Sequence, residues 1–575
     1  MNKKSSKNNM NAILALGAIA GATVVGAIAA KKLKDKSQNE IMTINYTENG
    51  EKQVYFVGGG LASLAGAAYL VRDCNFKGEN IHIIEGMNIL GGSNDGAGNS
   101  VDGFVCRGGR MLNEETYENF WELFSTIPSI DLPGKSVTEE ILNFDHLHPT
   151  HAQARLVDKD GVIQDVKSMG FNNSDRLALG KLMATSEEKL DNITIQEWFS
   201  NTPHFFETNF WYMWQTTFAF QKWSSLFEFK RYMNRMIFEF SRIETLEGVT
   251  RTQYNQYESV ILPLKEYLDG FGVDFSINAT VTDLDFKPGD DITVIAIHLI
   301  DVDGEKIINL NTEDICIMTN ACMTDSATLG DFNTPAEYDP NKPISGELWT
   351  KVAKKKIGLG NPEPFFSNPE QTNWESFTVT CRGNKFLKLI ENFSTNIPGS
   401  GALMTFKDSS WLMSIVVSAQ PHFKNQPLDT TIFWGYALYT DKIGDKVKKP
   451  MRDCTGEEML IELLYHLHME ELKDEIMETV VNVIPCMMPY VDAQFQPRMM
   501  SDRPQVIPKG STNFGMISQF VEIPEDMVFT EEYSVRAARI AVYTLFNIKH
   551  KRICPVTQHR KNPKVIKDAL KTTFR

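Results

Sequence analysis

The sequence predicts an α/β fold, and three neighbouring features between residues 54 and 85 carry the prediction. The stretch 54–57 is mostly apolar and β-favouring, which indicates a buried parallel strand. Three glycines follow it, and the Ala- and Leu-rich stretch 61–71 then favours a helix. A second β-favouring stretch, 81–85, ends in the acidic Glu85. Strand, glycine-rich turn, helix and second strand in this order are typical of a Rossmann-type domain.

The turn after the first strand has the spacing of a dinucleotide-binding motif. Gly58 permits the tight turn, and Gly60 lets the backbone approach a pyrophosphate at the positive N-terminus of the helix. Ser63 takes the place of the third glycine in G-x-G-x-x-G, where a small side chain still lets helix and strand pack closely. Glu85, 27 positions after Gly58, is placed to reach a ribose hydroxyl. Alone, the glycines would equally fit a plain turn.

Glycines and arginines just past the second strand indicate which dinucleotide is bound. A large cofactor that is held permanently is wrapped by extra loops, which favours FAD over a nicotinamide. An ordinary glycine-rich surface loop is the alternative. The residues expected to hold the cofactor here are Gly91, Gly92, Ser93, Arg107, Gly108, Gly109 and Arg110.

Composition limits the choice of partners. The chain has 575 residues, enough for two or three domains, and its net charge of −15 argues against nucleic acid as a partner. Its eight cysteines show no C-x-x-C spacing, so we expect reduced thiols in a cytosolic setting and no zinc site or other metal site.

The N-terminal segment predicts a hydrophobic helix outside the enzyme body. Residues 12–30 form an uncharged run with lysines on both sides, and 19 residues just suffice to cross a bilayer. Its Ala and Gly content makes the span marginal, so a cleaved signal peptide and an interfacial helix remain alternatives. The polar stretch 37–52 would be a linker. We expect a membrane-associated protein with its catalytic part in the cytoplasm.

The middle of the chain predicts helices and then a return to the first domain. Residues 112–240 are rich in Phe, Trp, Tyr and Met at helical spacing, which is typical of a core and also suits an apolar tunnel. The stretch 254–286 predicts a helix followed by strands. The stretch 307–320 predicts a strand whose end, at Thr319 and Asn320, meets the cofactor at the carboxyl edge of the sheet.

Residues 330–480 mix strand and helix patterns and predict a substrate-facing region. Within it, the stretch 408–423 offers Ser409, Ser410, Gln420 and His422 as donors for a carboxylate, although such side chains are more often structural. From residue 549 on the chain is basic, with Asp568 as its single acid. That tail is either merely solvated or attracted to anionic membrane lipid, worth about 1 kcal/mol per basic residue.

Several motifs together resemble one family from about residue 50 to about residue 550. They are VGGGLASLAGAAYLVRD, GGSNDG, RGGR, FWELFSTIPSID, TTFAFQKWSS, YNQYES, PHFK, MPYVDAQFQPR, DRPQVIP and QFVEIPEDMVFTEEYSVR. In this order they resemble the oleate hydratases, once called myosin-cross-reactive antigens. The resemblance implies an FAD-binding fold and an unsaturated long-chain fatty acid as substrate. It also implies that the segment 518–546, with Gln519 and Phe520, closes over the flavin.

The sequence departs from this family at two catalytic positions. Oleate hydratases carry a glutamate directly after R-G-G-R that is held to activate water, and Met111 stands there. They carry a tyrosine in W-x-Y-W that is held to protonate the alkene, and Met213 stands there. A thioether can neither donate nor accept a proton. Tyr212 and Glu114 are the neighbours that would help instead.

These losses favour double-bond migration over hydration. A reduced flavin can itself supply and remove a proton near a double bond. We therefore expect an FAD-dependent isomerase of linoleate-type fatty acids. The alternatives are a hydratase with relocated acid and base, a catalytically silent flavin- and lipid-binding protein and, least of all, a nicotinamide-linked dehydrogenase. A homodimer is a further expectation.

The predicted organisation alternates the cofactor domain with other parts. It has an anchor (1–36), a linker (37–52), three pieces of the FAD-binding domain (53–135, 241–330 and 481–548), a helical substrate region (136–240), a substrate-binding region (331–480) and a basic tail (549–575).

Overall fold

The computed structural model describes residues 42–44, 51–94, 96–108, 111–324, 326–340 and 344–575. Its centre is a parallel sheet of five strands in the order β18-β11-β2-β3-β7. The strands come from three stretches that lie far apart in the chain. Their bounds are β2 (Val54–Val57), β3 (Ile81–Ile84), β7 (Asp274–Ser276), β11 (Ile315–Thr319) and β18 (Phe514–Ile517).

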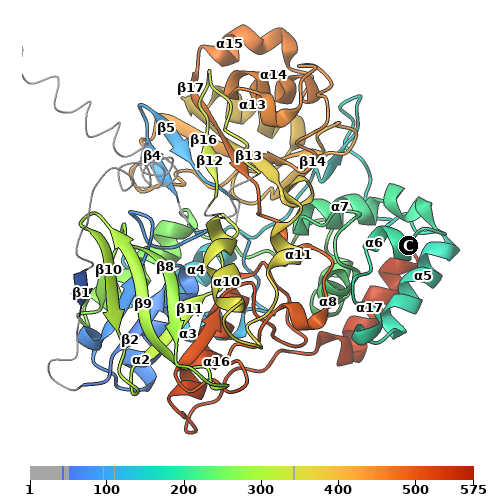
Figure 1. Cartoon of the computed structure of the whole chain (residues 1–575). Helices are drawn as coiled ribbons and strands as arrows, with labels where there is room; N and C mark the ends of the chain where they lie inside the picture. Colours follow the sequence, from blue (N-terminus) through green and yellow to red (C-terminus); the bar gives the residue numbers. More distant parts are fainter. Residues whose placement is uncertain (1–41, 45–50, 95, 109–110, 325, 341–343) are drawn as a thin grey trace, which may run out of the picture.

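The predicted strand–turn–helix is confirmed. β2 is buried at all four residues, and α2 (Leu61–Asp73) begins directly after the three glycines. A Cβ on Gly66 would lie 2.6 Å from the Phe56 ring, so a residue without a side chain lets α2 lie close on the sheet. Against α2 packs α16 (Glu531–Leu545), which belongs to the C-terminal part of the chain (Figure 1).

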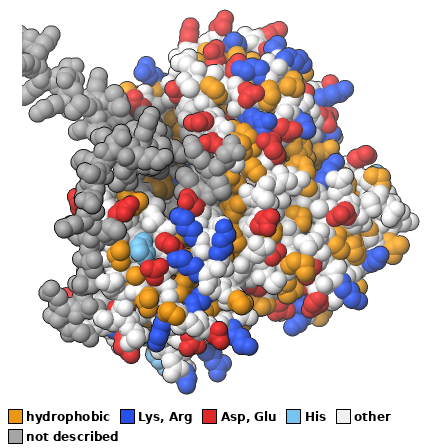
Figure 2. Space-filling model, in the orientation of Figure 1, with side chains coloured by type: hydrophobic (Ala, Val, Ile, Leu, Met, Phe, Trp, Pro, Cys, Tyr) orange, Lys and Arg blue, Asp and Glu red, His pale blue; other side chains and the backbone are white. Residues whose placement is uncertain are grey.

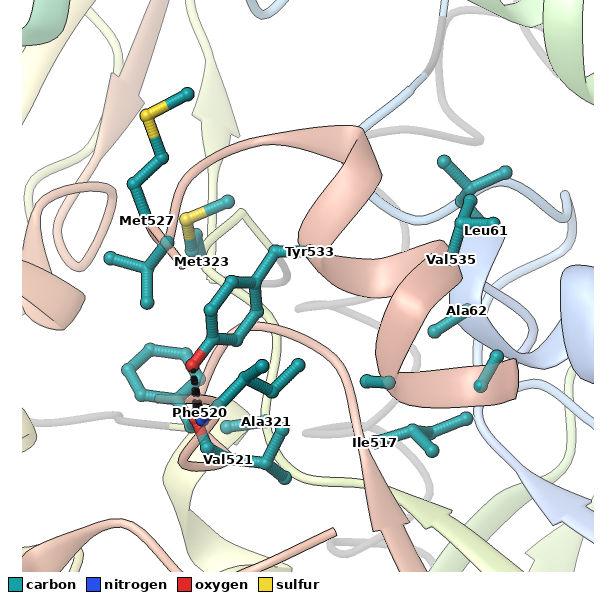
Figure 3. Close-up of a cluster of buried hydrophobic side chains, with 14 of the residues drawn as sticks. Leu61, Ala62, Ala321, Met323, Ile517, Phe520, Val521, Met527, Tyr533 and Val535 are labelled. Atoms are coloured by element: carbon teal, nitrogen blue, oxygen red, sulfur yellow. Dashed lines mark hydrogen bonds between the residues drawn. The ribbon is translucent and has the colours of Figure 1, made fainter. Parts of the chain in front are cut away.

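A buried apolar cluster joins the start of α2 to the segment before α16 (Figure 3). Leu61 and Ala62 meet Val535 of α16 there, and Phe520 and Val521 pack below Tyr533. The Tyr533 hydroxyl donates a hydrogen bond to the Val521 carbonyl (2.7 Å). Chain segments more than 450 residues apart therefore share one core.

An antiparallel meander with one added strand lies beside the central sheet. Its order is β1-β10-β9-β8, and its bounds are β1 (Met42–Ile44), β8 (Thr280–Phe286), β9 (Val294–Asp301) and β10 (Gly304–Asn309). The predicted strands after residue 270 are thus confirmed, because β7 and β8 follow the helix α9 (Leu262–Asp269).

A seven-stranded sheet, mostly antiparallel, forms the second large unit, with order β12-β17-β13-β16-β15-β14-β6. The strands are β6 (Leu156–Val157), β12 (Thr328–Leu329), β13 (Trp374–Arg382), β14 (Leu403–Phe406), β15 (Met413–Val416), β16 (Thr430–Ala437) and β17 (Val480–Met488). The helices α13 (Lys385–Ser394), α14 (Gly456–His466) and α15 (Lys473–Met477) cover it at the top of Figure 1. This unit has a second hydrophobic core of its own.

Helices fill most of the region between residues 118 and 241. They are α3 (Glu118–Phe124), α4 (Val137–Leu147), α5 (Asn173–Ala184), α6 (Ile195–Trp198), α7 (Asn209–Phe218) and α8 (Leu226–Arg235). Four aromatic side chains, Phe205, Phe210, Trp211 and Trp214, are buried against one another. Most of the aromatic residues predicted for this region therefore form core.

The basic C-terminal segment is folded onto the rest of the protein and is not a free tail. Lys551 pairs with the buried Asp73, and Arg560 pairs with Glu525 (3.2 Å). The last helix, α17 (Pro563–Thr573), packs beside the turn Ile237–Ser241. On the face shown in Figure 2, basic and acidic side chains are interspersed.

No helix within the described ranges combines the length and the apolar character needed to cross a bilayer. The predicted anchor, residues 12–30, lies outside those ranges.

Candidate functional site

A cavity of about 390 Å³ opens at the carboxyl edge of the parallel sheet. Val57, Ile84 and Thr319, at the ends of β2, β3 and β11, all line it. This is where open α/β sheets bind their ligands, because the loops that follow the strands diverge there. The cavity is therefore the candidate site.

The glycine turn forms one wall of the cavity. Gly58 has φ +93°, and a Cβ on it would lie 2.9 Å from the Thr319 Cβ, so glycine is required. Gly60 has φ −75°, and its backbone lies close to that of Gly92, whose Cα would be 3.8 Å from a Cβ on Gly60. Among the described residues no side chain caps the N-terminus of α2, so its first N–H groups are available to an anion. This wall fits a pyrophosphate.

Glu85 lies across the glycine turn at the end of β3. Its Oε2 accepts a hydrogen bond from the Gly59 N–H (2.6 Å) and its Oε1 accepts one from the Met87 N–H (2.8 Å). Burial raises the pKa of this carboxyl. Each oxygen keeps a second lone pair, so Glu85 can still accept a hydrogen bond from a hydroxyl group in the cavity.

Most of the residues predicted to hold the cofactor line this cavity. They are Gly58, Gly60, Glu85, Gly91, Gly92, Ser93, Gly108 and Gln519. Gly109 and Arg110 lie outside the described residues. The start of α16 also faces the cavity, through Thr530, Glu531 and Ser534.

Four of the predicted cofactor residues do not line the cavity. The Ser63 hydroxyl is within hydrogen-bond distance of Thr319 Oγ1 (3.2 Å) and joins α2 to β11. Arg107 donates to the Gly92 carbonyl (2.7 Å) and to the Thr324 carbonyl (2.6 Å), so it positions the loops that line the cavity.

Asn320 and Phe520 have a structural place as well. The Asn320 amide donates to the Phe520 carbonyl (2.8 Å), which ties two loops together. The Phe520 ring is fully buried and packs against Trp349 and Phe365. Both residues therefore lie behind the cavity wall and hold the loops that form it.

The two methionines at the catalytic positions lie differently. Met111 lines the cavity, whereas Met213 is fully buried and does not. The helpers expected beside them are not brought to the cavity either. Tyr212 lies on the outer side of α7 beneath the ammonium group of Lys407, and Glu114 lies at the surface, 3.7 Å from His146. The structure therefore gives no support to a catalytic role for Tyr212 or Glu114.

Glu239 is a carboxyl group in the cavity wall that sequence reasoning missed. It accepts hydrogen bonds from the Asn113 amide (3.0 Å) and from the Arg242 guanidinium (2.6 Å). Burial raises its pKa, although Arg242 opposes the shift. Glu239 is thus the candidate acid or base on the Met111 side of the cavity.

The far wall is apolar and comes from the second large unit. Trp374 belongs to β13, and Trp434 and Tyr436 belong to β16. Residues two apart on a strand share a face, so the pair Trp434 and Tyr436 was the signal that could have found this wall. Three aromatic side chains of the region 331–480, which was predicted to face the substrate, thus line the cavity.

A small polar cavity of about 30 Å³ adjoins the main one and shares Ser93, Asn94 and Gly108 with it. Arg251 lines it, and its Nε and Nη2 have no hydrogen-bond partner among the described residues. Burial lowers the pKa of Arg251 to about 10, so the guanidinium stays charged at neutral pH. The charged guanidinium of Arg251 therefore makes this cavity suitable for binding an anionic group.

His422 lines the same polar cavity, as the stretch 408–423 suggested. Its Nδ1 also lacks a partner within the described part of the chain, and burial lowers its pKa to about 4. The other donors proposed from that stretch are occupied or lie elsewhere. Ser410 donates to Asp445, Gln420 donates to the carbonyls of Ser418 and Ile432, and Ser409 is buried apart from both cavities.

Comparison with known proteins gives three kinds of match. Residues 51–543 match the model of the MCRA family. A linoleate hydratase from Lactiplantibacillus plantarum is 39% identical over 563 residues, which cover 91% of this chain and 99% of that protein. An oleate hydratase from Streptococcus pyogenes serotype M49 (strain NZ131) is 36% identical over 509 residues, which cover 86% of this chain and 85% of that protein.

Two solved structures are more distant. An oxidoreductase from Methanosarcina mazei has a TM-score of 0.48 at 10% identity, covering 85% of this chain and 99% of that one. A fatty acid isomerase from P. acnes that produces CLA has a TM-score of 0.45 at 12% identity, covering 87% of this chain and 99% of that one.

Proposed function

The chain belongs to the MCRA family, and we propose that it is an FAD-dependent isomerase that moves a double bond of linoleate-type fatty acids into conjugation. The names of the two hydratase relatives support an unsaturated fatty acid as the substrate. One observation carries the choice of reaction: Met111 lines the cavity at the position where the oleate hydratase pattern has a glutamate.

The cofactor proposal rests on the wall around the glycine turn. Gly60, the uncapped N-terminus of α2 and Glu85 fit the pyrophosphate and ribose of a dinucleotide. A reduced flavin bound there would supply proton donation and removal beside a double bond. The isomerisation adds one proton and removes another, so it requires neither a net oxidant nor oxygen from water.

The substrate would lie along the apolar wall with its carboxylate in the polar cavity. Arg251 supplies a buried positive charge there, and His422 and Gln256 line the same space. A carboxylate bound to Arg251 would give the buried guanidinium a direct partner in addition to the attraction of Asp145. The chain would then pass Trp374, Trp434 and Tyr436, which exclude water from the double bonds.

A hydratase is the second candidate, and Glu239 favours it. This carboxyl lines the cavity, as Asn113 and Met111 do, and burial raises its pKa, the direction that favours a protonated carboxyl able to donate a proton. In this alternative Glu239 replaces the missing glutamate and a water molecule adds to the double bond.

Membrane association is proposed for the C-terminal helix. Leu570 is 53% exposed and Phe574 is 67% exposed, and both lie among Lys561, Lys567 and Lys571. An apolar strip edged by lysines suits the surface of an anionic membrane, where the substrate dissolves. The N-terminal anchor, the cytoplasmic placement and a homodimer stay predictions.

One experiment separates the two reactions. The purified protein, loaded with reduced FAD, is incubated with linoleate in H₂¹⁸O. We expect conjugated diene absorbance and a product without ¹⁸O. A hydroxy product that carries ¹⁸O, and that disappears in Glu239→Gln, would replace the isomerase by the hydratase. A protein that binds linoleate and changes nothing would be the silent lipid-binding alternative.

A further inference from the structure

A buried histidine faces two carboxylates in the second large unit, away from both cavities. His466 Nε2 lies 3.4 Å from Glu462 Oε1 and 3.5 Å from Asp445 Oδ2. The histidine side chain is 6% exposed, and its Nε2 makes no hydrogen bond within the described part of the chain. A polar nitrogen that is buried and aimed at two carboxylates requires an explanation.

The distances do not suit a charge-assisted hydrogen bond but suit a shared metal ion. A histidine that donates to a carboxylate does so at about 2.7–2.9 Å. The pair His204 and Asp175 shows that contact in this protein, at 2.7 Å. Metal–ligand bonds of about 2.0–2.2 Å give a tetrahedron with edges of about 3.4 Å. The two distances from His466 match such edges, and the three ligand atoms lie within 4.8 Å of one another.

The charges also leave room for a cation. Within the described residues neither Asp445 nor Glu462 forms an ion pair with a lysine or an arginine, although Glu462 is fully buried. Nearby lysines are engaged elsewhere: Lys446 pairs with Glu470 (2.6 Å) and Lys449 with Glu458 (2.7 Å). Glu462 is fully buried with, among the described residues, only the backbone N–H groups of Asp445, Lys446 and Val447 to counter its charge, and a divalent ion would stabilise it further.

Surrounding hydrogen bonds hold the three groups in place. The Glu462 oxygens accept hydrogen bonds from the N–H groups of Lys446 and Val447 (both 2.9 Å), and the Ser410 N–H and hydroxyl donate to Asp445 (2.8 and 2.6 Å). The His466 ring stacks on Phe406. Outer contacts of this kind orient ligands at metal sites.

We propose that Asp445, Glu462 and His466 form a binding site for a divalent transition-metal ion, with Zn²⁺ as the best match. One histidine nitrogen and two carboxylate oxygens are ligands that Zn²⁺ accepts, and a water molecule reaches the fourth position beside Asp445, whose side chain is 29% exposed. The ion joins the loop 441–450 to the end of α14. Cysteine spacing could not indicate this site; the i, i+4 pair Glu462 and His466 could.

The test uses the full chain, purified without a histidine tag and freed of metal with a chelator. Titration with ZnCl₂ is expected to fill one site and to raise the midpoint of thermal unfolding, because the ion binds the folded state. In His466→Gln and in Asp445→Asn the affinity should fall by at least about tenfold, the loss that follows from removing even an orienting group. The matched control is His204→Gln, which removes a directly hydrogen-bonded histidine and should bind zinc as the wild type does.

Cobalt distinguishes this site from adventitious binding by thiols. Co²⁺ in the wild type should show the visible bands of a tetrahedral ion without a thiolate charge-transfer band. Asp445→Asn changes a partly exposed side chain, so it keeps the test valid if His466→Gln does not fold. Equal zinc binding in the wild type and in Asp445→Asn would overturn the proposal, as would a thiolate band.

Discussion

Asn94 donates a hydrogen bond from its side-chain amide to the Glu531 carboxylate (2.8 Å), although 437 positions separate the two residues. Both line the main cavity, so this contact closes the loop after β3 onto the start of α16. The cavity wall therefore depends on a bond between early and late segments of the chain.

We predict that Asn94→Ala weakens flavin retention. Removing the donor leaves a buried carboxylate without one of its partners, which costs about 1–3 kcal/mol, or about 5- to 150-fold in affinity. Release of flavin during dialysis, followed by its absorbance, measures the effect. Asn425→Ala is the matched control, because that amide donates to the Gly98 carbonyl near the surface. Unchanged retention in Asn94→Ala would show that this contact does not hold the wall.

Gly60→Val should abolish flavin binding without unfolding the protein. The backbone at Gly60 has φ −75°, which any residue adopts, and the nearest atom to an added Cβ is the Gly92 Cα at 3.8 Å. The branched side chain would instead occupy the space of the pyrophosphate. Gly180→Val, at an open position of α5, is the control. A Gly60→Val protein that is still yellow, with one flavin per chain, would refute the cofactor site.

Arg251→Met should impair the use of fatty acids through their carboxylate. We expect kcat/KM for linoleate to fall by about 10- to 100-fold, since a hydrogen bond to a charged group contributes about 1.5–3 kcal/mol. The methyl ester of linoleate serves as the control substrate, because it lacks the charge. If kcat/KM of the variant falls equally for linoleate and for its methyl ester, Arg251 does not bind the carboxylate.

His422 should make the folded state less stable in acid. Its pKa is lowered to about 4, mainly by burial, so between about pH 6.5 and pH 4 the unfolded chain binds a proton that the folded chain does not. Stability from this group is therefore complete at neutral pH and is lost as the pH falls through that window.

The free energies of unfolding of wild type and His422→Gln test this sign. The free energy of unfolding of His422→Gln minus that of the wild type should increase by up to about 2 kcal/mol as the pH falls from about 7.5 to about 5. The wild type loses stability in this range, whereas glutamine does not titrate. His148→Gln, which changes an exposed side chain, should show no such trend. A constant difference between wild type and His422→Gln across this range would contradict the prediction.

The double variant Leu570→Ser, Phe574→Ser should bind anionic phospholipid vesicles at least about tenfold more weakly than the wild type. Burying one exposed apolar side chain in a membrane contributes about 1.5–3 kcal/mol to the free energy of binding. Co-sedimentation measures the change, and Leu177→Ser on α5, also exposed, is the control. Deleting residues 1–36 in both backgrounds separates this contribution from that of the predicted anchor. Equal binding by wild type and double variant in the truncated chain would exclude α17 as a membrane contact.

Local patterns predicted the cofactor side of the fold well. The strand 54–57 was predicted to the residue, because the β-favouring run ends there at glycines. The second strand was predicted as 81–85 and ends one residue earlier, at Ile84. The residues of the second wall were not predicted, because β13 and β16 are neighbours in the sheet but lie far apart in the sequence. The spacing of Trp434 and Tyr436 indicates a shared face of a strand, but not that this face lines the cavity.

Predictions for single residues were wrong where the orientation of the side chain, and not its position in the sequence, decides whether it lines the cavity. Gln519 lines the cavity while its neighbour Phe520 points into the core. On α7 one step along the helix turns a side chain by about 100°, so Tyr212 points outward and Met213 inward. A motif supplies the position of such a residue but not the face on which its side chain lies.

The strand order of the parallel sheet determines when the sheet can be completed during synthesis of the chain. β2 leaves the ribosome early, yet its neighbour β11 and then the edge strand β18 follow only after long intervening segments. Until residues 514–517 have emerged, the open edge of β11 has no partner and the cavity lacks the wall supplied by α16. The open edge of β11 is therefore a place where an incomplete chain can pair with another chain. A cofactor that needs the wall supplied by α16 would therefore bind only after the chain is complete.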